Sequence, residues 1–318
     1  MAEIVLGIGT SHSPQLSIRA KDWSLLLQKD ETDKRLDYQG LLKRAKPNIE
    51  SELTEEKFRQ RDNACQQAIK TLGDVLQKAN ADVVVVFGDD QHEQFYDDNM
   101  PTFAIYHGKS LPVVAHTGRN PAGWKAAEER GWADTAHQYE TDYTLAEHLI
   151  RSLVNDEFDI ARCDRLREEI GVGHAFSFLY RRILPGGSLR MVPVMVNTYY
   201  PPNQPTPKRC YTFGQAVRRA IESWDGGKRV AIMASGGLSH VVIDEEIDQM
   251  TIEGLKNKQP EKLWRLPRER LRGGTSEILN WVALAGAVEP MKMTLVDYVT
   301  TYRSPAGTGC GMGFAYWN

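Results

Sequence analysis

Three short runs of almost continuously apolar residues constrain the fold of this chain more than any other feature. They occupy residues 3–8, 82–87 and 229–234, and each begins with a single charged residue. A strand with one face in water alternates polar and apolar side chains, and these runs do not alternate. They therefore predict strands that are covered on both faces, as in the parallel sheets of α/β proteins.

Helical patterns lie between the predicted strands. Apolar residues recur at helical spacing over 58–76, with Thr54 as the expected N-cap, and again over 142–154 and 209–224. Further strands are predicted at 101–105, 111–115 and 190–196, a polar loop at 116–140, and an interrupted helical region at about 244–288. Alternation of this kind predicts a layered α/β fold whose central sheet is mostly parallel or mixed and is flanked by helices.

The chain shows no internal repeat, low-complexity tract or Ser/Gly linker. We therefore expect one domain over residues 1–318, with a helical insertion at about 13–80. No apolar run approaches the roughly 20 residues that a bilayer span needs, and no basic segment leads into an apolar one at the N-terminus. These features predict a soluble, cytoplasmic protein without a membrane partner.

Charge and cysteine content argue against a nucleic-acid-binding protein, a disulfide-rich protein and a thiolate zinc site. The formal net charge is -3, so the chain has no large basic face for a nucleic-acid backbone, and we expect no nucleic-acid partner. The four cysteines are scattered without a Cys-x-x-Cys pair, which argues against a disulfide framework and against a thiolate zinc site.

One histidine follows each of the three opening runs, after a turn that contains Gly or Ser: His12, His92 and His240. The carboxyl ends of parallel strands meet at one sheet edge, where α/β proteins build their sites. Together with a carboxylate such as Glu277 or Glu245, these imidazoles could form a mononuclear site for Fe(II) or zinc. Spacing alone leaves this open, because no short motif such as His-Glu-x-x-His is present.

Several other Ser, Glu and His residues could suggest a catalytic or metal site, but we do not assign them such a role. Ser239 and His240 are adjacent and cannot readily form a nucleophile-to-base hydrogen bond, and no Gly-x-Ser-x-Gly motif exists, so a serine hydrolase is excluded. Glu245 and Glu246 are expected to be acidic residues at a helix start. We expect structural roles for His107, His116, His137 and His148.

Short motifs in one order across nearly the whole chain carry a family resemblance. The matching segments occupy residues 9–14, 90–95, 101–105, 156–159, 173–174, 200–202, 208–210, 236–240, 276–277 with Trp281, 305–306 and 311–312. In these segments the chain resembles the β-subunit family of class III extradiol dioxygenases, typified by protocatechuate 4,5-dioxygenase.

The resemblance implies Fe(II) held by His12, His92 and Glu277. It implies His240 as the acid/base residue and His174 as a second histidine that lines the pocket. The chain departs from the family pattern in two places. The spacing from His92 to Phe95 is one residue shorter than in the family pattern, and Gln91 is not expected to be an equivalent ligand. The stretch 13–80 is much longer than in the typical β-subunit.

The implied reaction is Fe(II)-dependent extradiol opening of a catecholic or gallate-type aromatic acid with both atoms of O2, in aromatic catabolism. Protocatechuate, gallate and 3-O-methylgallate are candidate substrates, with gallate-type rings preferred. A ring carboxylate needs a cation or backbone hydrogen-bond donors. The candidate residues are Arg303 and the nearby turn residues Ala306, Gly307 and Thr308. A surface role for Arg303 is equally open. We expect a homo-oligomer, with a dimer first, and a small α-subunit is not required because the insertion favours a self-contained pocket.

Two alternatives remain. One keeps the site but changes its chemistry, to a zinc-dependent dioxygenase of catechol derivatives or a metallohydrolase. The other is a non-catalytic binding relative, against which the retention of His12, His92, His240 and Glu277 speaks.

Overall fold

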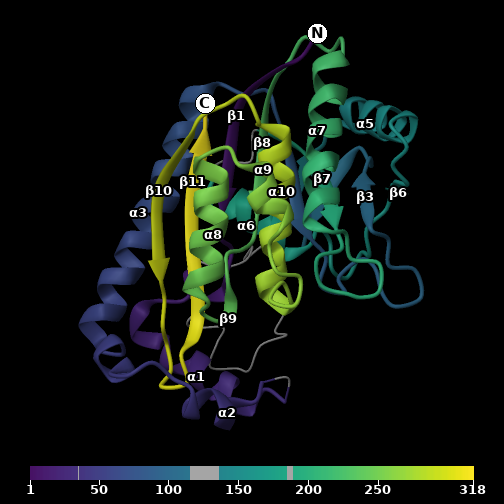
Figure 1. The fold of residues 1–318 in the computed structure, drawn as a ribbon. Helices are drawn as coiled ribbons and strands as arrows, with labels where there is room; N and C mark the ends of the chain where they lie inside the picture. The colour runs from purple at the N-terminus through teal and green to yellow at the C-terminus, as the bar shows by residue number, and fades with distance from the viewer. Residues whose placement is uncertain (35, 115–135, 185–188) are drawn as a thin grey trace.

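A mixed sheet forms the centre of the computed structural model, which describes residues 1–34, 36–114, 136–184 and 189–318 (Figure 1). Nine strands belong to it within these residues: β1 (Glu3–Thr10), β2 (Val83–Asp89), β3 (Phe103–Tyr106), β6 (Ala161–Cys163), β7 (Arg190–Val196), β8 (Arg229–Ser235), β9 (His240–Val242), β10 (Met293–Thr300) and β11 (Thr308–Trp317). Their order is β10-β11-β1-β8-β2-β7-β3-β6, and β9 pairs with β11.

The predicted buried strands form the parallel centre of this sheet. β1 pairs with β8, β8 with β2, and β2 with β7, all in parallel. Every residue of β2 is buried, as its continuous apolar run predicts. Because the strands are parallel, the turns that follow β1, β2 and β8 meet at one edge of the sheet.

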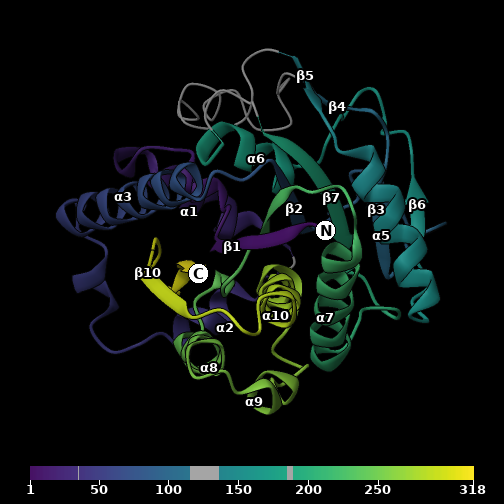
Figure 2. The ribbon, with the colours of Figure 1, turned by 90° about the horizontal axis from the view of Figure 1, so that it is seen from above.

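Helices cover both faces of the sheet (Figure 2). On one face, the side chains of Val83, Val85 and Phe87 join a core with helices α5 (Tyr143–Asn155), α7 (Pro207–Ser223) and α10 (Ile278–Ala287). On the other face, Val84 and Val86 pack with α3 (Glu55–Ala79) and α6 (His174–Arg182). The layered α/β fold predicted from the sequence is confirmed.

Most predicted helices form where the apolar spacing places them. Thr54 caps α3 by accepting a hydrogen bond from the N–H of Lys57 at 3.2 Å. The interrupted helical region divides into α8 (Glu245–Lys256), α9 (Pro260–Trp264), the 3-10 helix η4 (Gly273–Glu277) and α10. Glu245 and Glu246 lie in the first turn of α8, as expected.

The stretch predicted as an insertion, about 13–80, contains α3 and, before it, the short helices η1 (Pro14–Leu16), η2 (Ala20–Asp22), α1 (Ser24–Thr32), α2 (Tyr38–Lys43) and η3 (Ile49–Glu52). Sequence patterns did not predict β9 or the antiparallel pair of β10 and β11. Most of the polar loop predicted at 116–140 lies outside the described residues, and its end forms β5 (His137–Glu140), paired with β4 (Ser110–Val113). Among the described helices, none has the length and apolar character of a membrane span.

Candidate metal and catalytic site

The candidate site lies at the sheet edge where β1, β2 and β8 end. His12 follows β1, Gln91 follows β2, and His240 follows the turn after β8. Two further elements close around this edge: α6 begins with His174, and η4 ends with Glu277. Segments that are far apart in the sequence thus bring three imidazoles, an amide and a carboxylate together.

His12 presents an unprotonated nitrogen to the site. The hydroxyl of Ser235 donates its single hydrogen to the carbonyl oxygen of Ala175 at 2.6 Å, so it must accept the hydrogen of His12 Nδ1 at 3.0 Å. Burial, reinforced by the neighbouring His174 and His240, holds the pKa of His12 well below its ordinary value. The imidazole is therefore neutral, and its Nε2 lone pair lies 3.5 Å from Glu277 Oε2.

Glu277 has two differently surrounded carboxylate oxygens. Tyr199 donates its hydroxyl hydrogen to Oε1 at 2.8 Å, and the Gln91 amide lies 3.3 Å from the same oxygen. Oε2 accepts a hydrogen bond from the N–H of Gly237 at 2.9 Å and otherwise faces imidazoles. Glu277 is 1% exposed, and burial raises its pKa to about 6. Gly236 must lack a side chain here, because a Cβ would lie 2.5 Å from Oε2.

His240 is held in the same way as His12. Its Nδ1 donates to the carbonyl oxygen of Leu238 at 2.8 Å, because a carbonyl can only accept. Its Nε2 is buried, has no hydrogen-bond partner, and lies 3.6 Å from Glu277 Oε2. Burial lowers the pKa of His240, so this imidazole is also neutral.

His174 differs because a carboxylate holds it. Glu93 accepts hydrogen bonds from both the backbone N–H and Nδ1 of His174, each at 2.9 Å. Burial acts to lower the pKa of His174, but the charge and hydrogen bond of Glu93 outweigh it and raise the pKa to about 10. His174 therefore carries a proton, and its ring lies edge-on to that of His12, with centroids 4.7 Å apart.

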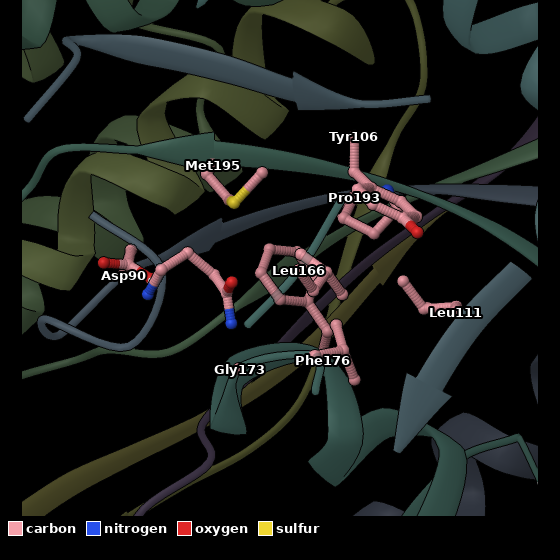
Figure 3. A pocket seen from close by; sticks show the side chains of 10 residues that line it. Asp90, Tyr106, Leu111, Leu166, Gly173, Phe176, Pro193 and Met195 are labelled. Carbon is pink, nitrogen blue, oxygen red and sulfur yellow. The ribbon is translucent and has the colours of Figure 1, made fainter. Parts of the chain in front are cut away.

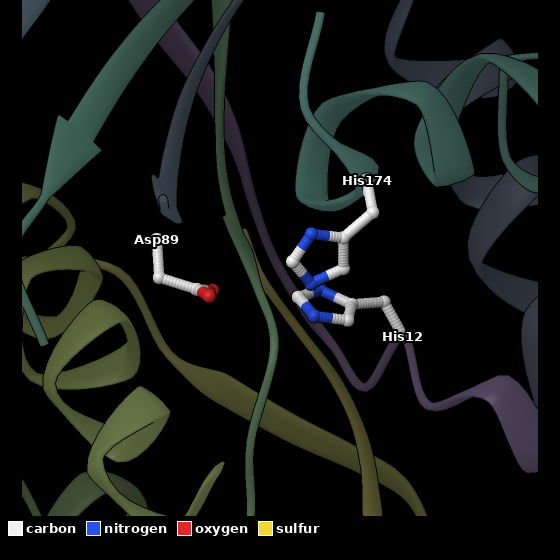
Figure 4. A group of neighbouring side chains, drawn as sticks. All are labelled: His12, Asp89 and His174. Carbon is white, nitrogen blue, oxygen red and sulfur yellow. The ribbon is translucent and has the colours of Figure 1, made fainter. Parts of the chain in front are cut away.

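Asp89 and Gln91 complete the interior of the cluster. Ligand atoms of Asp89, His12 and His174 all lie within 4.8 Å of one another (Figure 4). Burial raises the pKa of Asp89 to about 7, and its Oδ1 has no hydrogen-bond partner. The Gln91 amide nitrogen donates to Asp89 Oδ2 at 3.1 Å and lies 2.9 Å from the Tyr199 hydroxyl and 3.2 Å from His174 Nε2.

His92 does not join this cluster, which corrects its predicted place among the ligands. Its ring stacks on Tyr200 with centroids 3.8 Å apart, and its Nε2 lies 3.2 Å from Asp97. The physical reason is the backbone at His92, which has a φ of 55° and turns the chain sharply. Gln91 therefore points into the site while the adjacent His92 points away from it.

The donor set fits a divalent metal ion. The Nε2 atoms of His12 and His240 each face Oε2 of Glu277 without a hydrogen between them, and a cation beside this oxygen would relieve the repulsion between the lone pairs. Each imidazole also donates its other ring hydrogen to a fixed acceptor, as metal-binding histidines do. Two imidazoles with one carboxylate are typical of non-haem Fe(II) sites, and zinc accepts the same ligand types.

A pocket of about 780 Å³ opens beside these groups. His12, His174, His240 and Glu277 line it, so the polar cluster forms part of its wall. Helix α1 and the segment after it form another wall through Leu26, Lys29, Asp33 and Leu36. The volume lies within the range of small-molecule sites.

The predicted substrate contacts have a different environment from the one expected. Arg303 lines the pocket, but its side chain is only 8% exposed and binds both oxygens of Asp30, at 2.7 and 2.8 Å. A surface role for Arg303 is therefore wrong. Thr308 also donates to Asp30, at 2.6 Å, and the pocket lining does not include Ala306, Gly307 or Thr308. The structure does not bring these three to the pocket.

A second hollow lies among side chains of several elements, with Asp90 on one side of it (Figure 3). Asp90, Tyr106, Phe176 and Met195 are among the side chains around it, and its volume is only about 10 Å³. This is barely enough for one water molecule, so we assign no ligand to it.

Sequence reasoning missed five residues of the site: Asp89, Gln91, Glu93, Tyr199 and Ser235. The unexpected spacing to Phe95 was the one signal that pointed to Gln91. Acidic residues are usually exposed, so neighbours of His92 such as Asp89 and Glu93 gave no signal, yet they are only 1% and 9% exposed. Tyr199 lies in the aromatic turn after β7, whose direction the sequence does not reveal.

Comparison with known proteins supports the resemblance. A gallate dioxygenase from Pseudomonas putida is 33% identical over 158 residues, or 45% of each chain. A 2,3-dihydroxyphenylpropionate/2,3-dihydroxicinnamic acid 1,2-dioxygenase from Cupriavidus necator is 28% identical over 205 residues, covering 61% of this chain and 57% of that one. The chain thus spans about half the length of these curated relatives.

The family model described as the catalytic LigB subunit of aromatic ring-opening dioxygenase matches residues 47–313. This match contains every residue of the cluster except His12, and it begins inside the insertion. Because it covers far more than half of the chain, the protein belongs to the family of the catalytic LigB subunit of aromatic ring-opening dioxygenases.

Proposed function

We propose that this protein is an Fe(II)-dependent extradiol dioxygenase that opens the ring of a catecholic or gallate-type aromatic acid with both atoms of O2. One observation carries the proposal: the bare nitrogens of His12 and His240 face the Glu277 carboxylate at 3.5 and 3.6 Å beside a pocket large enough for an aromatic ring. Family membership supports the reaction class.

His12 and Glu277 are the proposed metal ligands from β1 and η4. When bound, the metal supplies Lewis acidity toward the ring hydroxyls and a common point for substrate and O2. The protein keeps these two ligands in place through Ser235, which fixes the His12 ring, and through Tyr199 and Gly237, which hold the carboxylate.

His174 is the proposed proton donor. Glu93 keeps its imidazole charged and fixes the ring from the Nδ1 side, so Nε2 faces the pocket. From this position it donates a hydrogen bond or a proton to an oxygen of the reacting ring. His240 is a second neutral imidazole of the pocket, and its bare Nε2 suits the acceptance of a substrate proton, as the family resemblance implies.

A ring carboxylate would find Arg303 already bound to Asp30. The carboxylate of a substrate must therefore compete with Asp30 for the Arg303 guanidinium, or it must bind another hydrogen-bond donor of the pocket wall. Gallate-type rings remain the proposed substrates because of the gallate dioxygenase among the relatives, and 2,3-dihydroxyphenylpropionate is a second candidate for the same reason.

The test is a substrate panel after anaerobic loading with Fe(II). Protocatechuate, gallate, 3-O-methylgallate and 2,3-dihydroxyphenylpropionate are mixed with the enzyme, while O2 uptake and the absorbance of ring-opened products are recorded. We expect one O2 consumed for each ring opened with at least one of these substrates. Activity that zinc restores and Fe(II) does not would contradict the iron assignment, and substrate binding without O2 uptake would favour the non-catalytic alternative.

A further inference from the structure

The cations of the pocket wall differ in whether a partner in the protein already holds them. Among the described residues, the lysines and arginines that line the pocket are Lys29, Arg270, Arg272 and Arg303. Arg303 is bound to Asp30, and Lys29 also has a partner. The carboxylate of a substrate would have to displace such a partner before it could bind either of these two side chains.

Arg270 is occupied by carboxylates at all three of its nitrogens. Its Nε donates to Asp244 Oδ2 at 2.8 Å, and its Nη2 donates to Oδ1 of the same residue. Its Nη1 donates to Glu246 Oε2 at 3.0 Å. The positive charge of Arg270 is therefore already compensated on the protein.

Arg272 differs from these three cations. Its side chain is exposed, and within the part of the chain that the structure describes no hydrogen bond or ion pair holds its guanidinium. A guanidinium carries five N–H donors and no acceptor, so it needs oxygen atoms as partners. In Arg272 these donors are free for water or for a ligand in the pocket.

The backbone holds Arg272 at a fixed place beside the pocket. Leu271, the residue before it, is 5% exposed and belongs to the core that contains α7 and α10. Gly273, the residue after it, has a φ of 52°, which favours glycine and turns the chain into η4. The backbone of Gly274 then packs against His240, since a Cβ at Gly274 would lie 2.2 Å from the Cβ of His240.

We propose that Arg272 binds the carboxylate of the aromatic acid and so selects carboxylated catechols over neutral ones. This inference rests on the proposed function, because it names the residue that determines the substrate class at the same site. A planar guanidinium binds a carboxylate through two parallel N–H···O bonds, which fixes the orientation of the acid as well as its charge.

The pocket wall gives the acid a direction. Arg272 directly precedes η4 and Glu277 ends it, and both line the pocket. Thr275 of η4 and the apolar side chains of Val241 and Val242 in β9 line the same pocket. An aromatic acid along this wall has its hydroxyls beside Glu277, its ring beside the valines and its carboxylate beside Arg272.

The exposure of Arg272 sets the size of its contribution. Water and salt screen an exposed ion pair much more than a buried one. We therefore expect a factor of about 10 in affinity, near the lower end for hydrogen bonds to charged groups. The same screening predicts that the contribution shrinks as the salt concentration rises.

The experiment compares acids with neutral analogues that lack only the carboxylate. Gallate is paired with pyrogallol, and 2,3-dihydroxyphenylpropionate with 3-ethylcatechol. Each is titrated calorimetrically and without O2 into the Fe(II)-loaded full chain, for the wild type, Arg272→Met, Arg272→Lys and the control Arg268→Met. Arg268 is exposed on the same segment and does not line the pocket.

For the acid that the wild type binds more tightly, we expect Arg272→Met to weaken binding by about 10-fold and to leave its neutral analogue unchanged. Arg272→Lys should keep part of the affinity, because an ammonium retains the charge without the paired donors. The Arg268→Met protein should bind all four compounds as the wild type does. Higher salt should narrow the difference between the wild type and Arg272→Met.

Circular dichroism shows that each variant is folded before its affinity is compared. An equal loss for an acid and its neutral analogue would overturn the proposal, because Arg272 would then act through η4 rather than on the carboxylate. Unchanged affinity in Arg272→Met, no preference of the wild type for either acid, or no binding of the four compounds would also overturn it.

O2 uptake by the same proteins separates this proposal from the proposed function. If binding of the acid depends on Arg272 as expected but no ring is opened, the proposed function fails while the carboxylate contact stands. If rings are opened and Arg272→Met binds both members of each pair as the wild type does, the carboxylate contact fails while the proposed function stands.

Discussion

At the scale of single residues, the site depends on which nitrogen of each histidine carries the hydrogen. Ser235, Glu93 and Leu238 each take a hydrogen from Nδ1 of a different imidazole, and all three Nε2 atoms are thereby turned toward the cluster. Only one of these partners is a carboxylate, and it is the one that keeps its histidine charged. The charge of each imidazole therefore depends on the group that accepts its Nδ1 hydrogen.

The serine beside His12 gives a prediction at this scale. Replacing Ser235 by Ala removes the acceptor for His12 Nδ1–H and frees the ring to rotate or change tautomer. We expect Fe(II) affinity to fall by about 10- to 100-fold while the protein remains folded. Chelator competition measures the affinity, and the exposed Ser51→Ala is the matched control. An unchanged affinity for Ser235→Ala would show that the hydroxyl does not position His12.

At the scale of elements, the contact between α7 and α10 decides where Glu277 stands. A Cβ at Gly214 of α7 would lie 1.8 Å from the carbonyl oxygen of Ala283, and a Cβ at Gly286 of α10 would lie 2.0 Å from that of Tyr211. The two helix backbones therefore touch. Because α10 starts directly after Glu277, a shift of this helix displaces the carboxylate.

Two glycine substitutions test this contact against ordinary helix propensity. Gly286→Ala inserts a methyl group between backbones, and we expect the free energy of unfolding to fall by about 1–3 kcal/mol. Gly73→Ala lies within α3, where the nearest atom to a new Cβ is 3.5 Å away, and we expect a gain of about 0.5–1 kcal/mol. Urea unfolding measures both. Equal effects of the two changes would contradict the close contact.

At the scale of the whole molecule, the insertion is fastened to the C-terminal strands. Asp30 of α1 binds Arg303, which follows β10, and Thr308, which begins β11. Asp30 is 3% exposed, so this ion pair is buried. The pair holds α1 beside the pocket and occupies Arg303, the cation that was predicted to bind the substrate.

Removing the carboxylate charge at this pair should loosen the insertion. In Asp30→Asn the buried Arg303 loses its charged partner, and we expect the free energy of unfolding to fall by about 3–5 kcal/mol. Hydrogen exchange should rise most in residues 14–34. The neighbouring exposed Glu31→Gln is the control, with a change within about 0.5 kcal/mol. Exchange that rises evenly over the whole chain in Asp30→Asn would contradict a local tether.

Local sequence patterns were sufficient to predict the class of fold and the strand ends on which the site is built. Runs such as 82–87 are apolar throughout, and hydrophobic burial depends only on that local pattern, so their place at the centre of the sheet was predictable. The family resemblance added Glu277 and His174, which spacing alone could not select. The antiparallel pair β10 and β11 was not predicted because neither strand is a continuous apolar run: β10 contains polar residues and β11 contains three glycines.

Which side chains share the site depends on how the whole chain folds. One backbone angle at His92 sends Gln91 inward and His92 outward, and a change of direction between adjacent residues leaves no trace in composition or periodicity. The charge of His174 likewise depends on Glu93, 81 positions away in the chain. Hydrogen bonds and ion pairs of this kind require atoms within about 3 Å, and only the folded chain brings such atoms together.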